Sequence, residues 1–279
     1  NRHVLRRDGE SYHRPGKYLP DLLVEEATRF IDESGEDPFF LYLPFAIPHY
    51  PVQPRREHRE LYERSGMEDK RRVLYGAYLT TLDDCVGRVL AAVEARGLTE
   101  RTLVIFLSDH GHSTEERAFG GGGQAGPYRG HKQTLWEGGI RVPCIASCPG
   151  RIPAGQVRQQ PAIAMDWLPT MAEFCDVPLP DDRPIDGRSL AAVMQSDKAP
   201  PPHQHLQWVH YDGSFAVREG PWKLHAAPEE RWLSNLEADP GERVNLVEEQ
   251  LDRVHDMVGA HNRWLRDVAG LSGLIRHTP

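Results

Sequence analysis

The chain has 279 residues, 39% of them hydrophobic and 27% charged, and its formal net charge at pH 7 is -8. This length can bury a sizeable core, as one large domain or as one domain with a smaller appendage. The acidic balance, with no basic stripe, excludes nucleic acid and anionic membrane as bulk partners. No apolar run approaches the length of a membrane span.

The first part of the chain alternates predicted helices and strands. Apolar residues recur at helical spacing over residues 19–34 and again over 69–96, and Gly35 and Gly97 supply the stops. Between these helices, the apolar residues 38–45 predict a strand covered on both faces, and the charged residues 55–66 predict a solvated helix or loop. Residues 101–108 predict a second buried strand. This order is typical of an α/β fold.

The second part begins with a Gly-rich loop over residues 114–130 and a third predicted strand within 131–150. A short helix is expected within residues 164–180, and the Pro-rich residues 197–205 read as a boundary. Four short strand candidates and a closing helix over 246–268 predict a small antiparallel sheet with a helix. We therefore expect two domains, residues 1–198 and 199–279.

Cysteine usage does not indicate a disulfide framework. If Cys144 and Cys148 lie on one strand, they share a face but sit roughly 13 Å apart, too far to bridge. Cysteine content therefore leaves the cellular compartment open.

Polar residues follow the second predicted strand directly. Asp109 and His110 stand at its carboxyl end, and Gly111 keeps the backbone accessible. A carboxylate beside an imidazole fits a pair of metal ligands or an acid–base pair, and a polar turn is the simpler alternative.

Two further segments carry candidate residues. His49 lies in a loop between prolines after the first predicted strand. Lys132 stands beside Arg129 and His131, a cationic cluster that suits an anionic group or forms an exposed basic turn. Each segment follows an apparent parallel strand, the edge at which α/β sheets bind ligands, so we expect one shared site.

Several segments resemble the sulfatases of the alkaline-phosphatase-like superfamily. The matching stretches are LSDHGH, GPYRGHKQTLWEGGIRVP, PGRIPAGQ, DWLPTMAEF, IDGRSL and VREGPWKL with LSNLEADPGERVNL. The resemblance covers nearly the whole chain. It implies part of a mixed or parallel sheet flanked by helices, followed by the small C-terminal subdomain.

The resemblance also implies roles for the candidate residues. Asp109 and His110 match positions that complete a divalent-cation site, usually calcium. Many members have Asn where His110 stands, and a nitrogen ligand suits hard calcium less well, so manganese competes. Lys132 matches a lysine that contacts the sulfate and its leaving oxygen, and His49 a histidine that contacts the sulfate and is a candidate proton donor. Arg129 and His131 are further candidate substrate contacts.

The family's nucleophile is a formylglycine made from the Cys or Ser of a C/S-x-P-x-R pattern, and we expect no nucleophile in this chain. None of its four cysteines is followed by P-x-R at that spacing. The simplest account is the C-terminal portion of a sulfatase whose formylglycine lies upstream. The alternatives are a half-protein that pairs with a separate N-terminal chain and a noncatalytic remnant. The polypeptide alone is expected to be inactive.

We therefore expect a sulfuric ester hydrolase acting on a small carbohydrate or aryl sulfate. The alternatives are a phosphonate or phosphodiester hydrolase of the same superfamily and a noncatalytic sulfatase-like binding protein. The family's habits imply an extracytoplasmic location, whether periplasmic, secreted or lysosomal.

Overall fold

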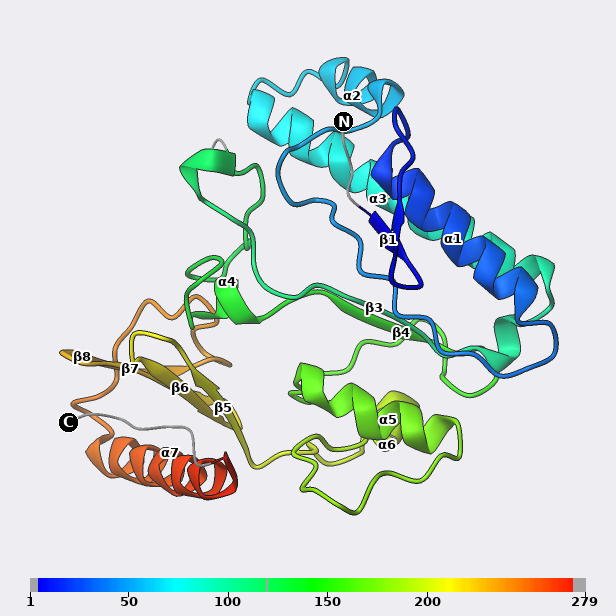
Figure 1. Cartoon of the computed structure of the whole chain (residues 1–279). Helices are drawn as coiled ribbons and strands as arrows, with labels where there is room; N and C mark the ends of the chain where they lie inside the picture. Colours follow the sequence, from blue (N-terminus) through cyan, green and yellow to red (C-terminus); the bar gives the residue numbers. More distant parts are fainter. Residues whose placement is uncertain (1–4, 119, 273–279) are drawn as a thin grey trace. The chain divides into compact units, whose positions relative to one another are not determined.

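A computed structural model describes residues 5–118 and 120–272, and the backbone packs as two compact units (Figure 1). Among the described residues, one unit holds 5–102 with 113–118 and 120–123, and the other holds 103–112 with 124–272. The domain boundary expected at residue 198 falls inside the second unit and stays a prediction.

Helices dominate the first unit. The two predicted helices are confirmed as α1 (Leu19–Glu33) and α3 (Lys70–Ala95), which pack on each other. The charged segment forms α2 (Arg56–Glu63), which buries no residue and is therefore the solvated helix that its composition predicts. The remaining elements are the hairpin β1 (Leu5–Arg7) and β2 (Glu10–Tyr12) and two 3-10 turns, η1 (Thr99–Arg101) and η2 (Glu116–Ala118).

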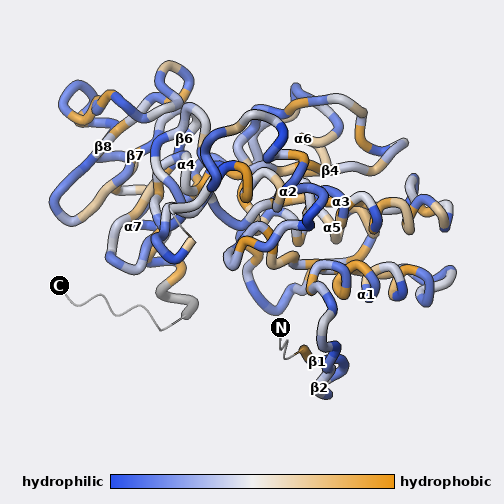
Figure 2. Tube along the Cα trace, turned by 90° about the horizontal axis from the view of Figure 1, so that it is seen from above, coloured by the Kyte–Doolittle hydropathy of each residue, from blue (hydrophilic) through white to orange (hydrophobic). Residues whose placement is uncertain are grey.

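Local chemistry explains where these helices start and which face they bury. The Asp69 carboxylate caps α3 by accepting a hydrogen bond from the Arg71 amide at 2.9 Å. Along α1 hydrophilic and hydrophobic residues alternate (Figure 2), and Leu22, Ala27 and Ile31 are buried.

The strand predicted over residues 38–45 is wrong. None of the described strands pairs with this segment, and no strand is assigned there. A strand requires a neighbour that satisfies its backbone N–H and C=O groups. Phe40 is 69% exposed and Tyr42 77% exposed, whereas the alternate residues of the run are half-buried. Phe45 packs against a buried cluster that includes Ile47 and Tyr78.

The other two strands of the α/β part exist but run in opposite directions. β3 (Val104–Leu107) pairs antiparallel with β4 (Cys144–Ser147), and Leu107 lies opposite Cys144. The connection returns the chain to the end at which β3 stops, so β4 starts there and runs back. The expectation that Asp109 and Lys132 follow two parallel strands is therefore wrong, although both residues still lie in that connection.

Short helices follow β4 in the second unit. The 3-10 turn η3 (Ala164–Asp166) leads into α5 (Trp167–Phe174), the predicted short helix, and α6 (Ala191–Gln195) packs beside it. Phe174, Leu190 and Met194 form a core with Cys148 from the end of β4.

Asp166 ties this region together. Its carboxylate is fully buried and accepts hydrogen bonds from His203 Nε2 at 2.6 Å and from the amides of Arg188 at 2.8 Å and Ile163 at 2.9 Å. Three segments distant in sequence therefore meet at one side chain, and both of its carboxylate oxygens are used as acceptors.

Replacing Asp166 with asparagine is expected to lower the free energy of unfolding by about 1–3 kcal/mol. All three partners are donors, and the asparagine amide turns one acceptor oxygen into a further donor, so at least one buried donor loses its bond. Urea unfolding followed by tryptophan fluorescence measures the change, with the exposed Asp197→Asn as the control. Equal stability of both variants would contradict the expectation.

The C-terminal subdomain matches its prediction. β5 (His205–Val209), β6 (Phe215–Glu219), β7 (Trp222–Ala227) and β8 (Glu230–Asn235) form an antiparallel sheet in chain order. The closing helix α7 (Leu251–Ser272) lies along one face of this sheet (Figure 1). Val254 and Met257 from α7 pack against buried residues of three strands, Val217, Leu224 and Leu233.

All four cysteines are free, as their spacing predicts. Within residues 5–118 and 120–272, no helix combines the length and the apolar character that crossing a bilayer requires.

Candidate functional site

The carboxyl end of β3 and the loop that carries Lys132 are joined through the backbone. The Lys132 amide donates to the His112 carbonyl at 2.9 Å, and the Gly111 amide donates to the Gly139 carbonyl at 2.9 Å. A third hydrogen bond, from the Gly138 amide to the Arg129 carbonyl at 2.6 Å, closes the loop on itself. Residues 109–112 and 129–139 thus form one backbone assembly, which we call the strand–loop junction.

Glycine is required at this junction because backbones meet there. A Cβ added to Gly111 would lie 1.9 Å from the Gly138 carbonyl oxygen, and one added to Gly139 would lie 2.2 Å from the Thr134 carbonyl oxygen. Neither position has room for a side chain. The short helix α4 (Glu137–Ile140) begins at this contact.

Asp109 and His110 lie next to each other at the junction. His110 Nδ1 lies 2.8 Å from the Gly111 carbonyl oxygen, which can only accept, so Nδ1 carries the proton. In the neutral ring Nε2 then holds a lone pair, and it lies 3.1 Å from Asp109 Oδ2. The Asp109 side chain is 83% exposed and open to further ligands.

These two side chains fit part of a cation site. A lone pair facing a carboxylate oxygen suits a shared cation, and a metal-binding histidine commonly donates its other ring N–H to a backbone carbonyl. Across residues 5–118 and 120–272, however, no group of three or more His, Cys, Asp or Glu side chains gathers to hold a metal. The expected role of Asp109 and His110 as metal ligands therefore stays a prediction.

The three cationic residues expected to cluster around Lys132 are close in sequence, but their side chains make different contacts. Lys132 is half-buried, and His131 turns its Nδ1 toward the Lys132 carbonyl at 2.8 Å. The Arg129 guanidinium instead stacks on the Trp136 ring, with 3.7 Å between the guanidinium carbon and the ring centroid. The expected roles of Arg129, His131 and Lys132 as substrate contacts stay predictions.

His112, two residues after His110, lies inside the junction. Its ring stands edge-on to His131 with 6.3 Å between centroids, and its buried Nδ1 has no hydrogen-bond partner in the described structure. Burial, and to a lesser degree the neighbouring His131, lower the pKa of His112. Only the folded contact between strand end and loop reveals this residue.

His49 belongs to the first unit. Its ring is exposed, its Nδ1 lies 2.7 Å from the Tyr50 carbonyl oxygen, and it packs on the Tyr50 ring with 4.5 Å between centroids. The peptide bonds before Pro48 and Pro51 are cis. The shared site expected for His49, Asp109 and Lys132 stays a prediction.

The nucleophile pattern expected to be absent is present once in the sequence, with serine at its head. Ser147, Pro149 and Arg151 give S-x-P-x-R, which attention to the cysteines alone overlooks. Ser147 pairs with Val104 at the start of β3, at the opposite end of the strand pair from Leu107 and the junction. Arg151 packs over the Phe174 ring at 4.2 Å and donates to the Phe174 carbonyl at 2.7 Å.

The pattern at Ser147 therefore serves packing. A nucleophile has to lie within reach of the groups that bind the reacting centre, and Ser147 is separated from Asp109 by the length of β3. The expectation of a nucleophile outside this chain stays a prediction.

Three fully buried charged residues anchor the junction to the C-terminal sheet, and we call them the buried charge cluster. Lys223 Nζ, on β7, lies 3.0 Å from Glu137 Oε1 and 3.0 Å from Glu242 Oε1. The second Glu242 oxygen accepts the Glu137 amide at 2.6 Å. Burial raises the pKa of Glu242, and the Lys223 charge opposes that rise.

His225 on β7 stacks on Trp136 beside this cluster, with 4.3 Å between centroids. Its pKa is lowered mainly by burial and next by the Lys223 charge. Arg129 acts in the same direction, whereas the carboxylates of Glu230 and Asp212 oppose it.

A lowered pKa in the fold means that the unfolded chain takes up this proton first. An unperturbed histidine has a pKa of about 6.5. As pH falls from there to the lower pKa of His225 in the folded chain, protonation of His225 should lower the free energy of unfolding. His225→Gln is expected to flatten the pH dependence of the unfolding free energy in this window. Urea titrations at several pH values measure it against the exposed His255→Gln on α7, which should leave the slope unchanged. The same slope for H225Q and wild type would contradict the assignment.

Comparison with known proteins identifies the family of this chain. The family model described as Sulfatase matches residues 2–177, which contain both β3 and the Lys132 loop. The chain belongs to the sulfatase family. A second family model, described as N-sulphoglucosamine sulphohydrolase, C-terminal, matches residues 128–261 of this sulfatase chain.

Curated sulfatases align with most of this chain. It is 37% identical over 214 residues to the steryl-sulfatase of Mus musculus, covering 74% of this chain and 32% of that protein. It is 32% identical over 263 residues to a sulfatase of Formosa agariphila, covering 84% of this chain and 46% of that protein. The chain therefore spans about a third to a half of the length of these relatives.

Solved structures confirm the alkaline-phosphatase-like fold of the family. The crystal structure of Ps i-CgsB in complex with k-i-k-neocarrahexaose superposes with a TM-score of 0.86 at 26% identity, covering 94% of this chain and 58% of that one. The structure of BT4656 with D-glucosamine-2-N,6-O-disulfate shares the fold at a TM-score of 0.73 and 17% identity, covering 94% of this chain and 71% of that one. The α/β class with a small C-terminal sheet and helix is thus confirmed.

Proposed function

We propose that the complete protein hydrolyses sulfate esters, with this chain supplying the cationic and metal-binding part of the active site. The observation that carries the proposal is the strand–loop junction, where the backbone fixes Lys132 relative to Asp109 and His110. Cleaving a sulfate ester breaks the bond between sulfur and the alcohol oxygen, and negative charge grows on that oxygen and on the sulfate oxygens. Fixed positive groups stabilise such charge.

Each candidate residue has one task in this proposal. Lys132 stabilises the charge on the sulfate and on the leaving oxygen as the sulfur–oxygen bond breaks. His49 delivers a proton to the departing alkoxide so that a neutral alcohol leaves. The nucleophile, a formylglycine, comes from a segment outside this chain, and Ser147 takes no part.

Asp109 and His110 would hold a divalent cation together with ligands from outside the described residues. Calcium is the first choice because of the family, and the nitrogen donor of His110 makes manganese its competitor. When bound, the cation supplies Lewis-acid polarisation of sulfate oxygens.

A carbohydrate sulfate is the proposed substrate, with an aryl sulfate as the alternative. The match of residues 128–261 to the N-sulphoglucosamine sulphohydrolase C-terminal model supports a sugar, and so does the complex of Ps i-CgsB with neocarrahexaose. The identity of 37% to a steryl-sulfatase supports the alternative. We further propose that the protein works outside the cytoplasm, in keeping with its family.

The test joins this chain to an upstream sulfatase segment that carries C-x-P-x-R. Once mass spectrometry has confirmed formylglycine in the product, we expect hydrolysis of 4-nitrophenyl sulfate or of a sulfated monosaccharide. No turnover of either despite confirmed formylglycine would refute the proposal. Ser147→Ala is the matched control, because it should leave the rate unchanged if the nucleophile lies elsewhere.

Phosphonate or phosphodiester hydrolysis is the second candidate, favoured by the nitrogen donor of His110. Rates on matched sulfate and phosphate esters, with calcium and with manganese, separate the two activities. A third outcome, binding of sulfated ligands without turnover by the same joined protein, would indicate the noncatalytic alternative.

A further inference from the structure

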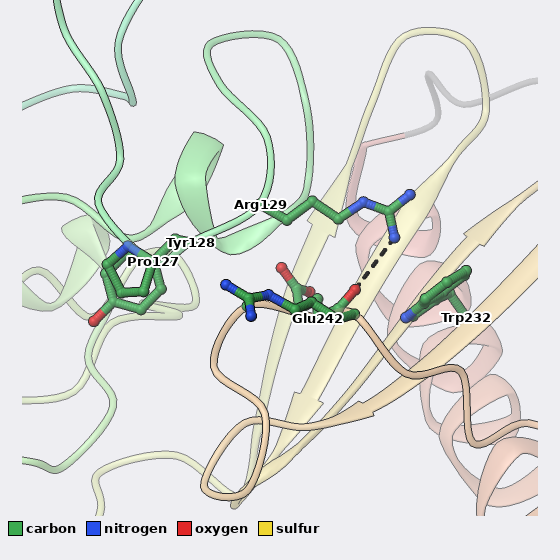
Figure 3. A pocket seen from close by; sticks show the side chains of 7 residues that line it. Pro127, Tyr128, Arg129, Trp232 and Glu242 are labelled. Carbon is green, nitrogen blue, oxygen red and sulfur yellow. Dashed lines mark hydrogen bonds between the residues drawn. The ribbon is translucent and has the colours of Figure 1, made fainter.

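A pocket of about 400 Å³ lies beside the junction, within the second unit. The loop before α4 contributes Pro127, Tyr128 and Arg129, and β8 with the following turn contributes Trp232, Gly241, Glu242 and Arg243. Figure 3 shows Arg129 reaching over the Glu242 backbone toward Trp232. This volume is within the range of small-ligand pockets, so it admits a group of monosaccharide size.

Arg129 is held in a defined position in this pocket. Its guanidinium carbon lies 3.7 Å from the centroid of the Trp136 ring and 4.6 Å from that of Trp232. One terminal nitrogen donates to the Glu242 carbonyl at 3.3 Å, the bond drawn dashed in Figure 3. Stacking and this single bond leave the other guanidinium donors of Arg129 open.

The positive charge of the pocket has no internal counter-charge. Neither Arg129 nor Arg243 forms an ion pair with any described residue, and both side chains are exposed. Glu242 is the one acid in the lining, and its carboxylate oxygens already accept from Lys223 Nζ and the Glu137 amide. The protein has a net charge of -8, so two arginines without ion-pair partners make the charge of this pocket opposite to that of the whole chain.

A third hydrogen-bond donor at the pocket has no acceptor. The indole nitrogen of Trp232 is buried and has no hydrogen-bond acceptor in the described structure. In Figure 3 this nitrogen is on the edge of the ring that faces Glu242. A buried N–H without an acceptor costs free energy, and a ligand oxygen in the pocket would remove that cost.

The position of the pocket indicates what kind of molecule fills it. Arg129 and Lys132 lie on one loop three residues apart, and the hydrogen bonds of the strand–loop junction hold both ends of that segment. A molecule with one anionic group at Lys132 and a second anionic group in the pocket would contact both residues of this loop. Guanidinium and indole N–H donors match sulfate and carboxylate oxygens.

We propose that this pocket binds a second anionic group, a sulfate or carboxylate, of a polyanionic carbohydrate whose cleaved sulfate lies at Lys132. The proposal rests on the proposed function, which it sharpens toward oligosaccharides that carry charge on more than one unit. The pocket confers chain-length and charge selectivity and takes no part in bond breaking.

The experiment titrates the 279-residue chain with a heparin-derived tetrasaccharide and records the indole N–H resonances by NMR. Trp232→Phe assigns the Trp232 resonance, because it removes the N–H and keeps an aromatic ring. We expect the Trp232 signal to shift on titration with the tetrasaccharide. A neutral maltotetraose and inorganic sulfate at the same concentration should leave it in place.

Arg243→Gln is expected to weaken tetrasaccharide binding about tenfold through loss of one charge-assisted hydrogen bond. Arg231→Gln is the matched control, an exposed arginine on β8 that does not line the pocket, and it should bind as wild type does. Circular dichroism confirms the fold of each variant. A Trp232 signal that does not move, an unchanged affinity in R243Q, or an equal shift with inorganic sulfate would overturn the proposal.

Failure of the proposed function looks different. In the joined protein, turnover of 4-nitrophenyl sulfate tests the reaction without the pocket, and the KM for a sulfated tetrasaccharide tests the pocket. If the joined protein hydrolyses aryl sulfate but R243Q and wild type have the same KM for the tetrasaccharide, the pocket proposal fails and the hydrolase proposal stands. Tetrasaccharide binding at Trp232 without any hydrolysis would overturn the hydrolase and leave a polyanion-binding protein.

Discussion

Replacing Lys223 with methionine is expected to lower the free energy of unfolding by about 3–5 kcal/mol, the cost of removing one partner from a buried ion pair. Lys223 is 1% exposed and is the cation between Glu137 and Glu242 in the buried charge cluster. Methionine fills a similar volume but leaves Glu242 without its cation, whereas Glu137 keeps Arg141 at 3.6 Å and Arg218 at 3.9 Å. Urea unfolding at pH 7 measures the loss.

The pH dependence of the same variant separates charge from packing. Burial already raises the pKa of Glu242, and the loss of Lys223 raises it further. When the pKa of a carboxyl is raised in the folded chain, the protein loses stability as pH rises from the unfolded pKa to the folded pKa. The difference in unfolding free energy between wild type and K223M should therefore be smaller at pH 5 than at pH 7. A deficit that does not change with pH would assign the loss to packing.

Two further variants complete this test. The exposed Lys198→Met removes a lysine of the same size without uncovering a buried charge, and it should unfold like the wild type. The double variant K223M/E242Q should be more stable than K223M alone, because it removes the charge of Glu242, whose one ion-pair partner among the described residues is Lys223. A double variant less stable than K223M would contradict the role given to Glu242.

Lys132→Ala in the joined protein is expected to lower kcat for sulfate ester hydrolysis by about 10²–10³-fold, the usual cost of losing one group that stabilises developing charge. The effect should be larger for an alkyl sulfate than for 4-nitrophenyl sulfate, because a poorer leaving group needs more stabilisation of its oxygen. Steady-state rates on both substrates measure the difference.

Lys132→Arg and Gln133→Asn are the controls for this loop. Arginine keeps the charge but not the geometry, so K132R should lie between K132A and wild type. Q133N alters the exposed neighbouring residue, whose φ of 69° asparagine tolerates, and should change kcat far less. Equal loss of rate on both leaving groups in K132A would restrict Lys132 to binding the sulfate.

Local patterns predicted most elements of this fold correctly. The apolar periodicity of α1 and α3 and the turn residues between β5 and β8 lie within single segments, and each was confirmed. Strand pairing depends on distant partners, and the predictions failed there. Residues 38–45 have a strand's composition but no described neighbour, and nothing within 104–147 states that β4 returns antiparallel to β3.

The candidate site also combines features visible in the local sequence with features that only the fold reveals. Adjacent residues such as Asp109 and His110 are visible in the sequence, whereas the contact of His112 with His131 exists only after the loop has folded back. The buried charge cluster joins positions 137, 223 and 242, and no spacing rule connects them. At Ser147 the sequence misleads in the other direction. The S-x-P-x-R pattern matches that of the nucleophile, but Ser147 lies at the end of β4 that is distant from the junction.

The contact between Gly111 and Gly138 has a consequence for how this sulfatase can diversify. Since the approach is made by main-chain atoms with no space for a Cβ, the Lys132 backbone is tied to the end of β3 by contacts that no side-chain substitution removes directly. The loop also depends on Thr134, whose hydroxyl bonds the His131 amide and carbonyl, and on Gln133, whose φ of 69° favours glycine or asparagine as its replacement. Libraries that keep these residues and the glycines should vary the loop surface while the Lys132 backbone stays in place.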